Sequence, residues 1–166
     1  MAVNQNPEWS GTNQPLTALT TNAEAVRTLA RIVAGTFGPK GLDCMLVGEA
    51  GEAIITNDGA TILKTIDITH PAARIFINAI QLHEEKVGDG TTTASLVAEA
   101  LVTEGVNQVL KGVPVIKVID GIKLGIEAAL RILAESKMPI EGLDSPLLER
   151  VAIIAARGQR DLADLV

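Results

Sequence analysis

The scarcity of aromatic residues constrains the fold of this chain more than any other feature. Among 166 residues, of which 47% are hydrophobic, the only aromatic side chains are Trp9, Phe37 and Phe76. The core must therefore be built from Ala, Val, Ile and Leu, whose side chains suit closely packed helices. Charged residues make up 20% of the chain, so a packed domain is expected rather than disorder.

The periodicity of the apolar residues predicts a mainly α fold with one small β-hairpin. A first helix is expected to begin near Thr21 or Asn22, both good caps, and a long helix to run from Thr91 to Leu110. Further helices are expected near 60–63, from Pro71 onward, at 114–136 and at 146–156. Two apolar runs, 45–47 and 53–56, flank a glycine-containing turn and predict the hairpin.

Two packing details follow from the same patterns. In the helix that starts at Pro71, Ile75, Ala79 and Leu82 are expected to line the apolar face. Gly121 and Gly125 lie one turn apart in the 114–136 helix. Since each glycine costs ~1 kcal/mol relative to Ala in a helix, close packing is the expected reason for them.

Charge and cysteine content narrow the class of function. The formal charge is −6, which argues against a nucleic-acid partner because binding to a phosphate backbone needs clustered Lys and Arg. Cys44 is the only cysteine, so an internal disulfide is excluded. No apolar run approaches the ~20 residues of a membrane span, and the polar residues after Met1 are unlike a signal peptide. We therefore expect a cytoplasmic protein with no membrane partner.

Three glycine-containing segments, 38–41, 57–61 and 88–93, interrupt the helical pattern where helices start or end. The third is the most informative. Gly88 and Gly90 allow backbone amides to come close to a ligand, and three threonines follow at the first turn of a long helix. The unpaired amides and the helix dipole at that point favour an anion.

Asp89 suggests how such an anion would be held. The helix dipole contributes only ~0.3–2 kcal/mol, too little for a polyphosphate, so a cation is expected to share the load. A carboxylate is the hard oxygen ligand that Mg²⁺ prefers, together with phosphate oxygens and waters. The alternative is that residues 88–90 form a tight turn and the threonines only cap the helix. The chain has neither a Walker A pattern nor a Rossmann glycine fingerprint.

Other polar residues near these segments have simpler explanations. Asp58 follows the hairpin as a turn residue, and its functional alternative is to orient a water for attack on a γ-phosphate. Lys40 is expected on the surface, and residues 84–86 form a solvated helix end. His70 suits a helix start, and it lies too far in sequence from His83 to predict a metal site.

Taken together, the segments 36–43, 55–63, 70–73 and 87–93 resemble the chaperonin signature in their order and spacing. The forms at 57–61 and 70–73 are similar to those of group II (thermosome-type) chaperonins rather than group I, and the resemblance covers residues 20–166. Phe37, Cys44 and Lys86 depart from the usual residues, which suggests a divergent lineage, such as a bacterial member of the archaeal type.

The resemblance implies an ATP-binding equatorial-domain helical bundle and a role for single residues. Asp89 would ligate Mg²⁺, and Asp58 would help to position the water that attacks ATP. The nucleotide-binding residues would be Phe37, Gly38, Pro39, Gly59, Gly88, Gly90, Thr91, Thr92, Thr93 and Gly158. The loop around Gly158 is similar to a nucleotide-sensing loop in which a lysine is usual, whereas Gln159 and Arg160 stand here.

The resemblance also implies a division of the chain and a set of partners. Residues 1–20 would be a flexible arm, 21–156 the first half of the equatorial domain, and 157–166 the sensing loop and the start of a connection to an absent intermediate domain. Subunits would form a homo-oligomeric double ring, with the hairpin pairing with a neighbouring subunit. Unfolded polypeptide clients would bind to domains that are absent here. We expect the chain alone to bind ATP weakly and to hydrolyse little or none.

Two other hypotheses stay open at this point. The chain could be a non-hydrolysing structural or interaction fragment of a chaperonin, which nucleotide titration with and without Mg²⁺ would reveal. It could also be a helical phosphate-binding enzyme unrelated to chaperonins, which would turn over a small phosphorylated substrate and form no ring-sized particles.

Overall fold

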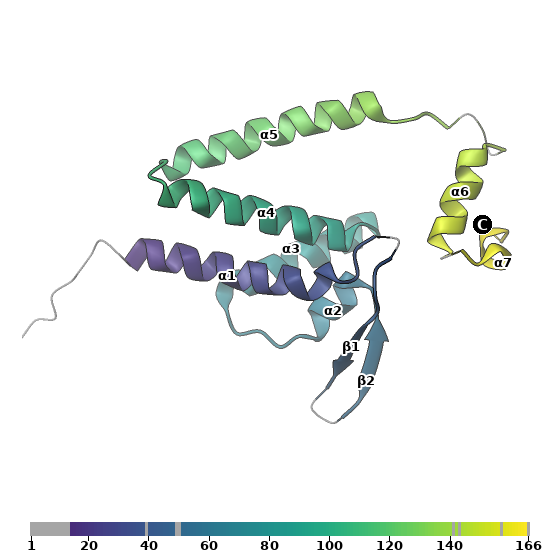
Figure 1. Cartoon of the computed structure of the whole chain (residues 1–166), viewed down its shortest axis with the longest axis horizontal. Coiled ribbons are helices and arrows are strands. Elements are labelled where there is room, and N and C mark those ends of the chain that lie inside the picture. Colours follow the sequence, from purple (N-terminus) through teal and green to yellow (C-terminus); the bar gives the residue numbers. More distant parts are fainter. Residues whose placement is uncertain are drawn as a thin grey trace, which may run out of the picture. The chain divides into compact units, whose positions relative to one another are not determined.

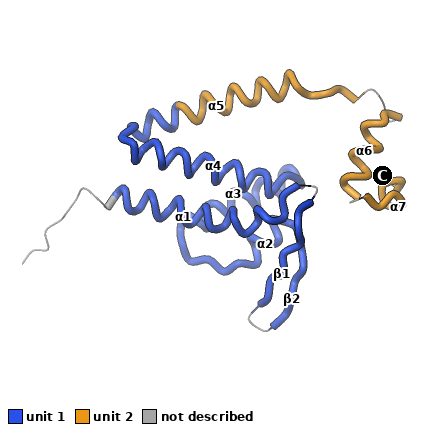
Figure 2. The backbone as a smooth tube through the Cα atoms, viewed as in Figure 1, with its two compact units in different colours: residues 1–120 blue, residues 121–166 orange. Residues whose placement is uncertain are grey.

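The computed structural model describes residues 14–38, 40–48, 51–140, 142, 144–156 and 158–165. Within them the chain is mainly α with one small hairpin, as predicted, and falls into two compact units that divide after Asp120 (Figures 1 and 2). The elements in chain order are α1 (Gln14–Ala34), β1 (Cys44–Val47), β2 (Ala53–Thr56), α2 (Gly59–Thr65), α3 (Pro71–Val87), α4 (Thr91–Leu110), α5 (Val115–Ser136), α6 (Pro146–Ala155) and α7 (Arg160–Ala163).

Helix α1 begins at Gln14 and not near Thr21, so the prediction of its start was wrong. The hydroxyl of Thr21 donates to the carbonyl of Thr17 at 2.8 Å, and that of Thr20 donates to Leu16 at 3.0 Å. These threonines therefore bond back inside the helix instead of capping it. The end of the proposed arm is thus helical, while Trp9 and the rest of residues 1–13 lie outside the described residues.

The core of the first unit lies where α1, α2 and α3 meet, with α4 packed alongside. Leu29 and Val33 of α1 and Ile62 and Leu63 of α2 are almost completely buried. The apolar residues that recur at three- and four-residue spacing in α1, Ala23, Val26, Ala30 and Val33, are all buried, whereas Ala34 is half-buried and Phe37, beyond the helix, is exposed. Among the described residues the core contains a single aromatic side chain, Phe76, so aliphatic packing dominates it.

Helix α3 carries two apolar stripes, and the prediction chose the wrong one. Ile75, Ala79 and Leu82 are exposed. The buried residues of α3 are Ala73, Phe76, Ile77 and Ile80. Both stripes have helical spacing, so periodicity alone cannot separate them. Burial of the stripe that contains Phe76 removes the larger apolar area from water, which favours it.

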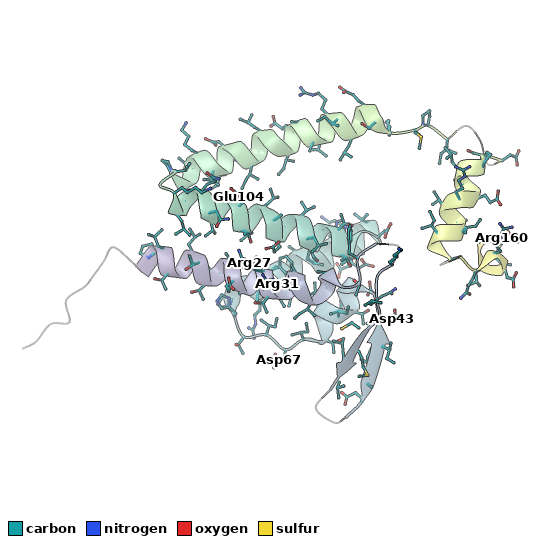
Figure 3. All side chains as sticks on the ribbon, viewed as in Figure 1. Arg27, Arg31, Asp43, Asp67, Glu104 and Arg160 are labelled. Carbon is teal, nitrogen blue, oxygen red and sulfur yellow. The ribbon has the colours of Figure 1, made fainter. Side chains whose placement is uncertain are left out.

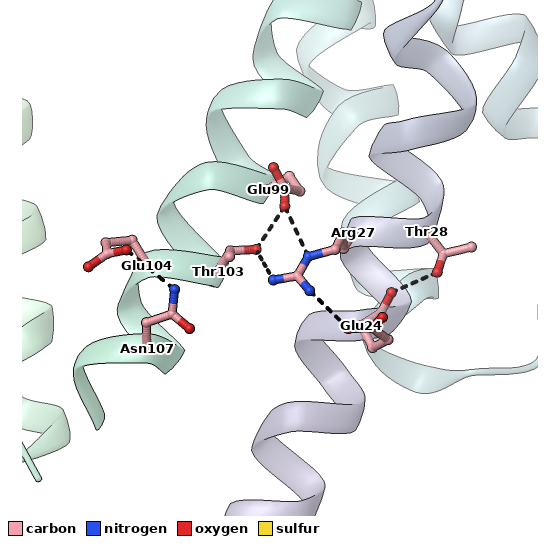
Figure 4. A network of polar contacts seen from close by, with 7 residues as sticks. All are labelled: Glu24, Arg27, Thr28, Glu99, Thr103, Glu104 and Asn107. Carbon is pink, nitrogen blue, oxygen red and sulfur yellow. Dashed lines mark hydrogen bonds and ion pairs between the residues drawn. The ribbon is translucent and has the colours of Figure 1, made fainter. Parts of the chain in front are cut away.

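Helices α1 and α4 lie side by side and antiparallel. At one end of the pair the Thr36 hydroxyl, just beyond α1, lies 3.1 Å from that of Thr92. Further along, Arg27 reaches Glu99 at 3.5 Å and Thr103 at 3.3 Å (Figure 4). Arg27 also contacts Glu24 at 3.2 Å within its own helix. Since partly exposed ion pairs contribute ~0–1 kcal/mol, this network fixes the alignment of the two helices more than it stabilises them.

The predicted hairpin is present, with β1 and β2 antiparallel and Cys44 opposite Thr56. Its loop residues 49–50 lie outside the described residues. The side chains of Cys44 and Leu46 pack against the core of the first unit, which gives a two-stranded sheet the support that it lacks in isolation. Met45 and Ile55 are exposed on the other face.

The second unit runs from residue 121 onward. Ser145 caps α6 by accepting a hydrogen bond from the Leu147 amide, with Pro146 at the first helical position as predicted. The short helix α7 was not predicted. A Cβ placed on Gly121 or Gly125 would meet no described atom within 4 Å, so the described residues of the second unit do not give these glycines the close packing expected. None of the described helices has the length and apolar character needed to cross a membrane.

Candidate functional site

The first turn of α4 is where the three glycine-containing segments meet. The hydroxyl oxygen of Thr36, two residues before the first segment, lies 3.1 Å from that of Thr92 in the third. The second segment also lies close by, because a Cβ placed on Gly59 would lie only 3.0 Å from Thr92 Oγ1. Segments that are far apart in sequence thus converge on one helix start, which supports treating them as one site.

Thr36 holds the side chain of Thr92. The Thr36 hydroxyl donates to the carbonyl of Val33 at 2.8 Å, which uses its only proton. In the contact between the two threonines, Thr36 must therefore accept and Thr92 must donate. Thr36 was not among the predicted site residues, although it lies next to one of them.

The backbone at the start of α4 forms a cradle for an anion. Gly88 and Gly90 both have left-handed φ angles, 74° and 73°, which residues with a Cβ rarely adopt. The first hydrogen bond of the helix runs from the Ala94 amide to the Gly90 carbonyl. The amides of residues 91–93 therefore have no carbonyl partner within α4. Asp89 is exposed between the two glycines, and its Oδ1 accepts from the Gly90 amide at 2.7 Å.

The three threonines of this turn are not equivalent. Thr91 is only 5% exposed, and its hydroxyl donates to the carboxylate of Glu84 at the end of α3. Thr92 is held by Thr36, whereas Thr93 is exposed. The predicted contact of all three with phosphate stays a prediction, and in this arrangement Thr91 has its amide rather than its hydroxyl to offer.

The last turn of α3 was missed as part of the site. His83 Nε2 lies 2.9 Å from the backbone oxygen of Asp89, and Glu84 accepts from Thr91. From the sequence, His83 lies too far from His70 to predict a metal site, and Glu84 was predicted to lie on a solvated helix end. Their position about one turn before Gly88 could have indicated that they belong to the site. A chain that reverses direction at Gly88 brings the last turn of α3 beside the start of the next helix.

Asp58 is the N-cap of α2. Its Oδ2 accepts from the Thr61 amide at 2.7 Å and from the Thr61 hydroxyl at 2.5 Å. Partial burial raises the pKa of the Asp58 carboxyl, but these bonds, the Ala60 amide and the charge of Lys64 outweigh it and hold the pKa below 3.8. Because the folded-state pKa is lowered, the cap stabilises the fold at neutral pH, and its contribution is lost as the pH falls through that lowered value.

The remaining predicted residues lie in two places. Phe37 is 53% exposed and precedes Gly38, whose φ is 81°. Pro39 lies outside the described residues. Gly158 belongs to the second unit, where it follows α6 with a φ of 81° and donates its amide hydrogen to the carbonyl of Ile153 at 2.8 Å.

The residues fit a magnesium ion that arrives with a nucleotide. No group of three or more His, Cys, Asp or Glu side chains in the described ranges could hold a metal by itself. Mg²⁺ needs only one or two carboxylates when phosphate oxygens and waters complete its shell. One exposed carboxylate, that of Asp89, stands beside the amide cradle, and this donor set matches that need.

Comparison with known proteins agrees with this geometry. A model of the TCP-1/cpn60 chaperonin family matches residues 29–166. Thermosome subunit beta of Archaeoglobus fulgidus is 40% identical over 138 residues, and thermosome subunit alpha of Methanothermobacter thermautotrophicus is 41% identical over 138. Each alignment covers 83% of this chain and 25% of the relative.

The crystal structure of a group III chaperonin in the open state superposes with a TM-score of 0.84 and 46% sequence identity. The match covers 92% of this chain and 31% of that one, so the chain spans between a quarter and a third of these relatives. The resemblance to thermosome-type chaperonins is thereby confirmed, and the hypothesis of an unrelated phosphate-binding enzyme was wrong. This chain, folded as part of a chaperonin equatorial domain, belongs to the TCP-1/cpn60 chaperonin family.

Proposed function

We propose that this chain is the Mg-ATP-binding part of a chaperonin subunit, and that ATP hydrolysis there drives a protein-folding cycle. The observation that carries the proposal is the convergence of Thr36, Gly59 and Thr92 at the start of α4. That convergence gathers three loops around a cradle of amides. Unpaired amides at a helix start favour an anion, and the two further loops provide additional contacts around it.

Each loop has a distinct task in this proposal. The amides of residues 91–93 bind phosphate oxygens, and the glycines on either side of Asp89 let the backbone approach closely. Asp89 would hold the magnesium ion, which supplies charge neutralisation on the phosphates when bound. Asp58 orients the attacking water. Its pKa is lowered, so it is ionised at neutral pH, and it adjoins Gly59, where an added Cβ would lie 3.0 Å from Thr92 Oγ1.

The activity of the whole protein is proposed on the same basis. Family membership supports assembly with other subunits into a homo-oligomeric double ring and action on unfolded polypeptide clients. Because the chain covers 25% of its thermosome relatives, we assign client binding and part of the catalytic machinery to regions of those relatives that this chain does not match. The 166-residue chain alone is then expected to bind ATP weakly and to hydrolyse little or none.

Titration of the purified chain with ATP tests the proposal. Amide chemical shifts of Thr36, Gly59 and residues 88–93 are expected to move together, with higher affinity in magnesium than in EDTA. The alternative of a non-binding interaction fragment predicts unchanged shifts at every ATP concentration up to the millimolar range. That result would refute the proposed function of this segment.

Gly59→Ala is expected to weaken Mg-ATP binding about three- to tenfold while leaving the fold nearly as stable. The added Cβ would lie 3.0 Å from Thr92 Oγ1 and 3.5 Å from the Thr92 amide nitrogen, so the cradle must shift by a few tenths of an ångström. Alanine has a higher helix propensity than glycine by up to ~1 kcal/mol, and this gain offsets the loss of folding free energy that the crowding causes. Calorimetric ATP titration and thermal unfolding measure the two effects separately.

Gly121→Ala is the matched control, because a Cβ on Gly121 meets no described atom within 4 Å. It should raise the unfolding free energy by up to ~1 kcal/mol and leave ATP affinity unchanged. Equal ATP affinities of the Gly59→Ala variant and the unmodified chain would show that α2 does not border the nucleotide.

A further inference from the structure

The loop between α3 and α4 is tied back to the last turn of α3 by three contacts. The Gly88 amide donates to the backbone carbonyl of Glu84 at 2.8 Å. His83 Nε2 lies 2.9 Å from the Asp89 carbonyl oxygen. The Thr91 hydroxyl donates to the Glu84 carboxylate. Two side chains of adjacent residues thus hold both sides of the segment that carries Asp89.

We propose that His83 and Glu84 are positioning residues of this phosphate-binding loop, and that the charge of Glu84 makes the loop select magnesium-complexed over free nucleotide. The inference rests on the proposed function of the α4 helix start, and it assigns a task to two side chains that make no contact with the reacting atoms.

The need for such a clamp follows from the loop's own sequence. Gly88 and Gly90 flank Asp89, and glycine loses more conformational freedom on ordering than any other residue. A carbonyl oxygen can only accept, so His83 must carry its proton on Nε2 to bond with Asp89. That bond fixes the peptide that follows Asp89, and with it the direction in which the Asp89 carboxylate leaves the backbone.

Glu84 acts through both its hydrogen bond and its charge. The bond holds Thr91 at the first position of α4. The carboxylate also places a negative charge beside a cradle that must accept phosphates. Repulsion is stronger for free ATP than for its magnesium complex, whose charge is smaller. Glu84 therefore disfavours the metal-free nucleotide, whereas a residue that only packs would affect both forms equally.

His83 is tested with a pair of variants of the full chain. His83→Ala is expected to weaken Mg-ATP binding about tenfold, as is usual when the partner that orients a metal ligand is lost. His83→Gln places an N–H donor at a similar reach and should restore affinity to within about threefold. Equal affinity of the alanine variant and the unmodified chain would overturn the role of His83, as would a failure of glutamine to rescue.

The test of Glu84 separates the effect of its hydrogen bond with Thr91 from the effect of its charge. Glu84→Gln keeps an acceptor for Thr91 but removes the charge, so ATP affinity in EDTA should rise about three- to tenfold with little change in magnesium. Glu84→Ala also loses the bond and should weaken Mg-ATP binding about tenfold. Glu85 is exposed, and Glu85→Gln and Glu85→Ala are the matched controls. If Glu84→Gln leaves the ratio of the two affinities unchanged, the selectivity claim is wrong.

A second measurement separates this inference from the proposed function. Amide shifts and hydrogen exchange of Gly90 and Thr91 in the nucleotide-free chain should change in His83→Ala and Glu84→Ala but not in Glu85→Ala. If the unmodified chain binds no ATP, the proposed function fails, and these signals alone then decide whether the clamp exists. If it binds ATP but the clamp variants match it in affinity and in amide signals, only the clamp fails.

Discussion

Replacement of Asp89 by asparagine is expected to reduce sharply the effect of magnesium on ATP binding. Asp89 is exposed beside an amide cradle that by itself prefers the more negative ligand. With the carboxylate, magnesium would raise affinity, because Asp89 would hold the ion that the phosphates bring. Without it, only the repulsion between Glu84 and the free nucleotide would be left to favour the magnesium complex. In magnesium the loss should exceed about a hundredfold, because even partners outside the metal's ligand shell contribute about 10–100-fold.

The matched control for Asp89→Asn is Asp67→Asn, which makes the same charge change at an exposed residue of the loop between α2 and α3 (Figure 3). It should keep the magnesium dependence of the unmodified chain. Calorimetric titrations in magnesium and in EDTA measure the four affinities. An undiminished preference of the Asp89→Asn variant for Mg-ATP would place the metal ligand elsewhere.

Ile62→Ala is expected to have the largest effect on stability, a loss of about 2–5 kcal/mol in the free energy of unfolding. Ile62 is 0% exposed in the core, where α2 packs between α1 and α3. Domains commonly have only about 5–15 kcal/mol to lose, so the midpoint of thermal unfolding should fall by roughly 5–15 °C. Circular dichroism at 222 nm, a wavelength standard for helices, follows the transition.

Ile75→Ala removes the same atoms from a residue that is 71% exposed and serves as the control. It should change the unfolding free energy by no more than about 0.5 kcal/mol. Similar losses for the two variants would mean that Ile75 is covered in solution, and that the buried stripe of α3 has been wrongly assigned.

Helix boundaries were predictable wherever residues beside the boundary, such as a glycine or a capping residue, determine it. The bounds of α4 were predicted because glycine breaks the pattern before Thr91 and again after Leu110, and α6 because Ser145 and Pro146 form a cap. The start of α1 was not predictable in this way. Thr21 is a good cap in isolation, but as part of a helix its hydroxyl finds an equally good acceptor one turn back.

The loops of the candidate site were predictable from the sequence, but the residues that hold those loops in place were not. Glycine and aspartate mark segments 57–61 and 88–93 because such turns need those residues. No such residue type identifies Thr36, His83 or Glu84, since a threonine after a helix and polar residues at a helix end are ordinary surface features. Their roles depend on tertiary contacts across the α1–α4 and α3–α4 pairs, which no local pattern encodes.

The antiparallel pairing of α1 with α4 sets an order of events during synthesis. A ribosome releases α1 first, and the residues that bond to Thr36 and Arg27 appear only with α4. In the interval Val26, Leu29 and Val33 can pack against α2 and α3 but lack the α4 side chains Ala94 and Ala98, and apolar surface left uncovered favours aggregation of a nascent chain. This chain therefore passes through a period in which it can aggregate, and that period ends only when α4 leaves the exit tunnel.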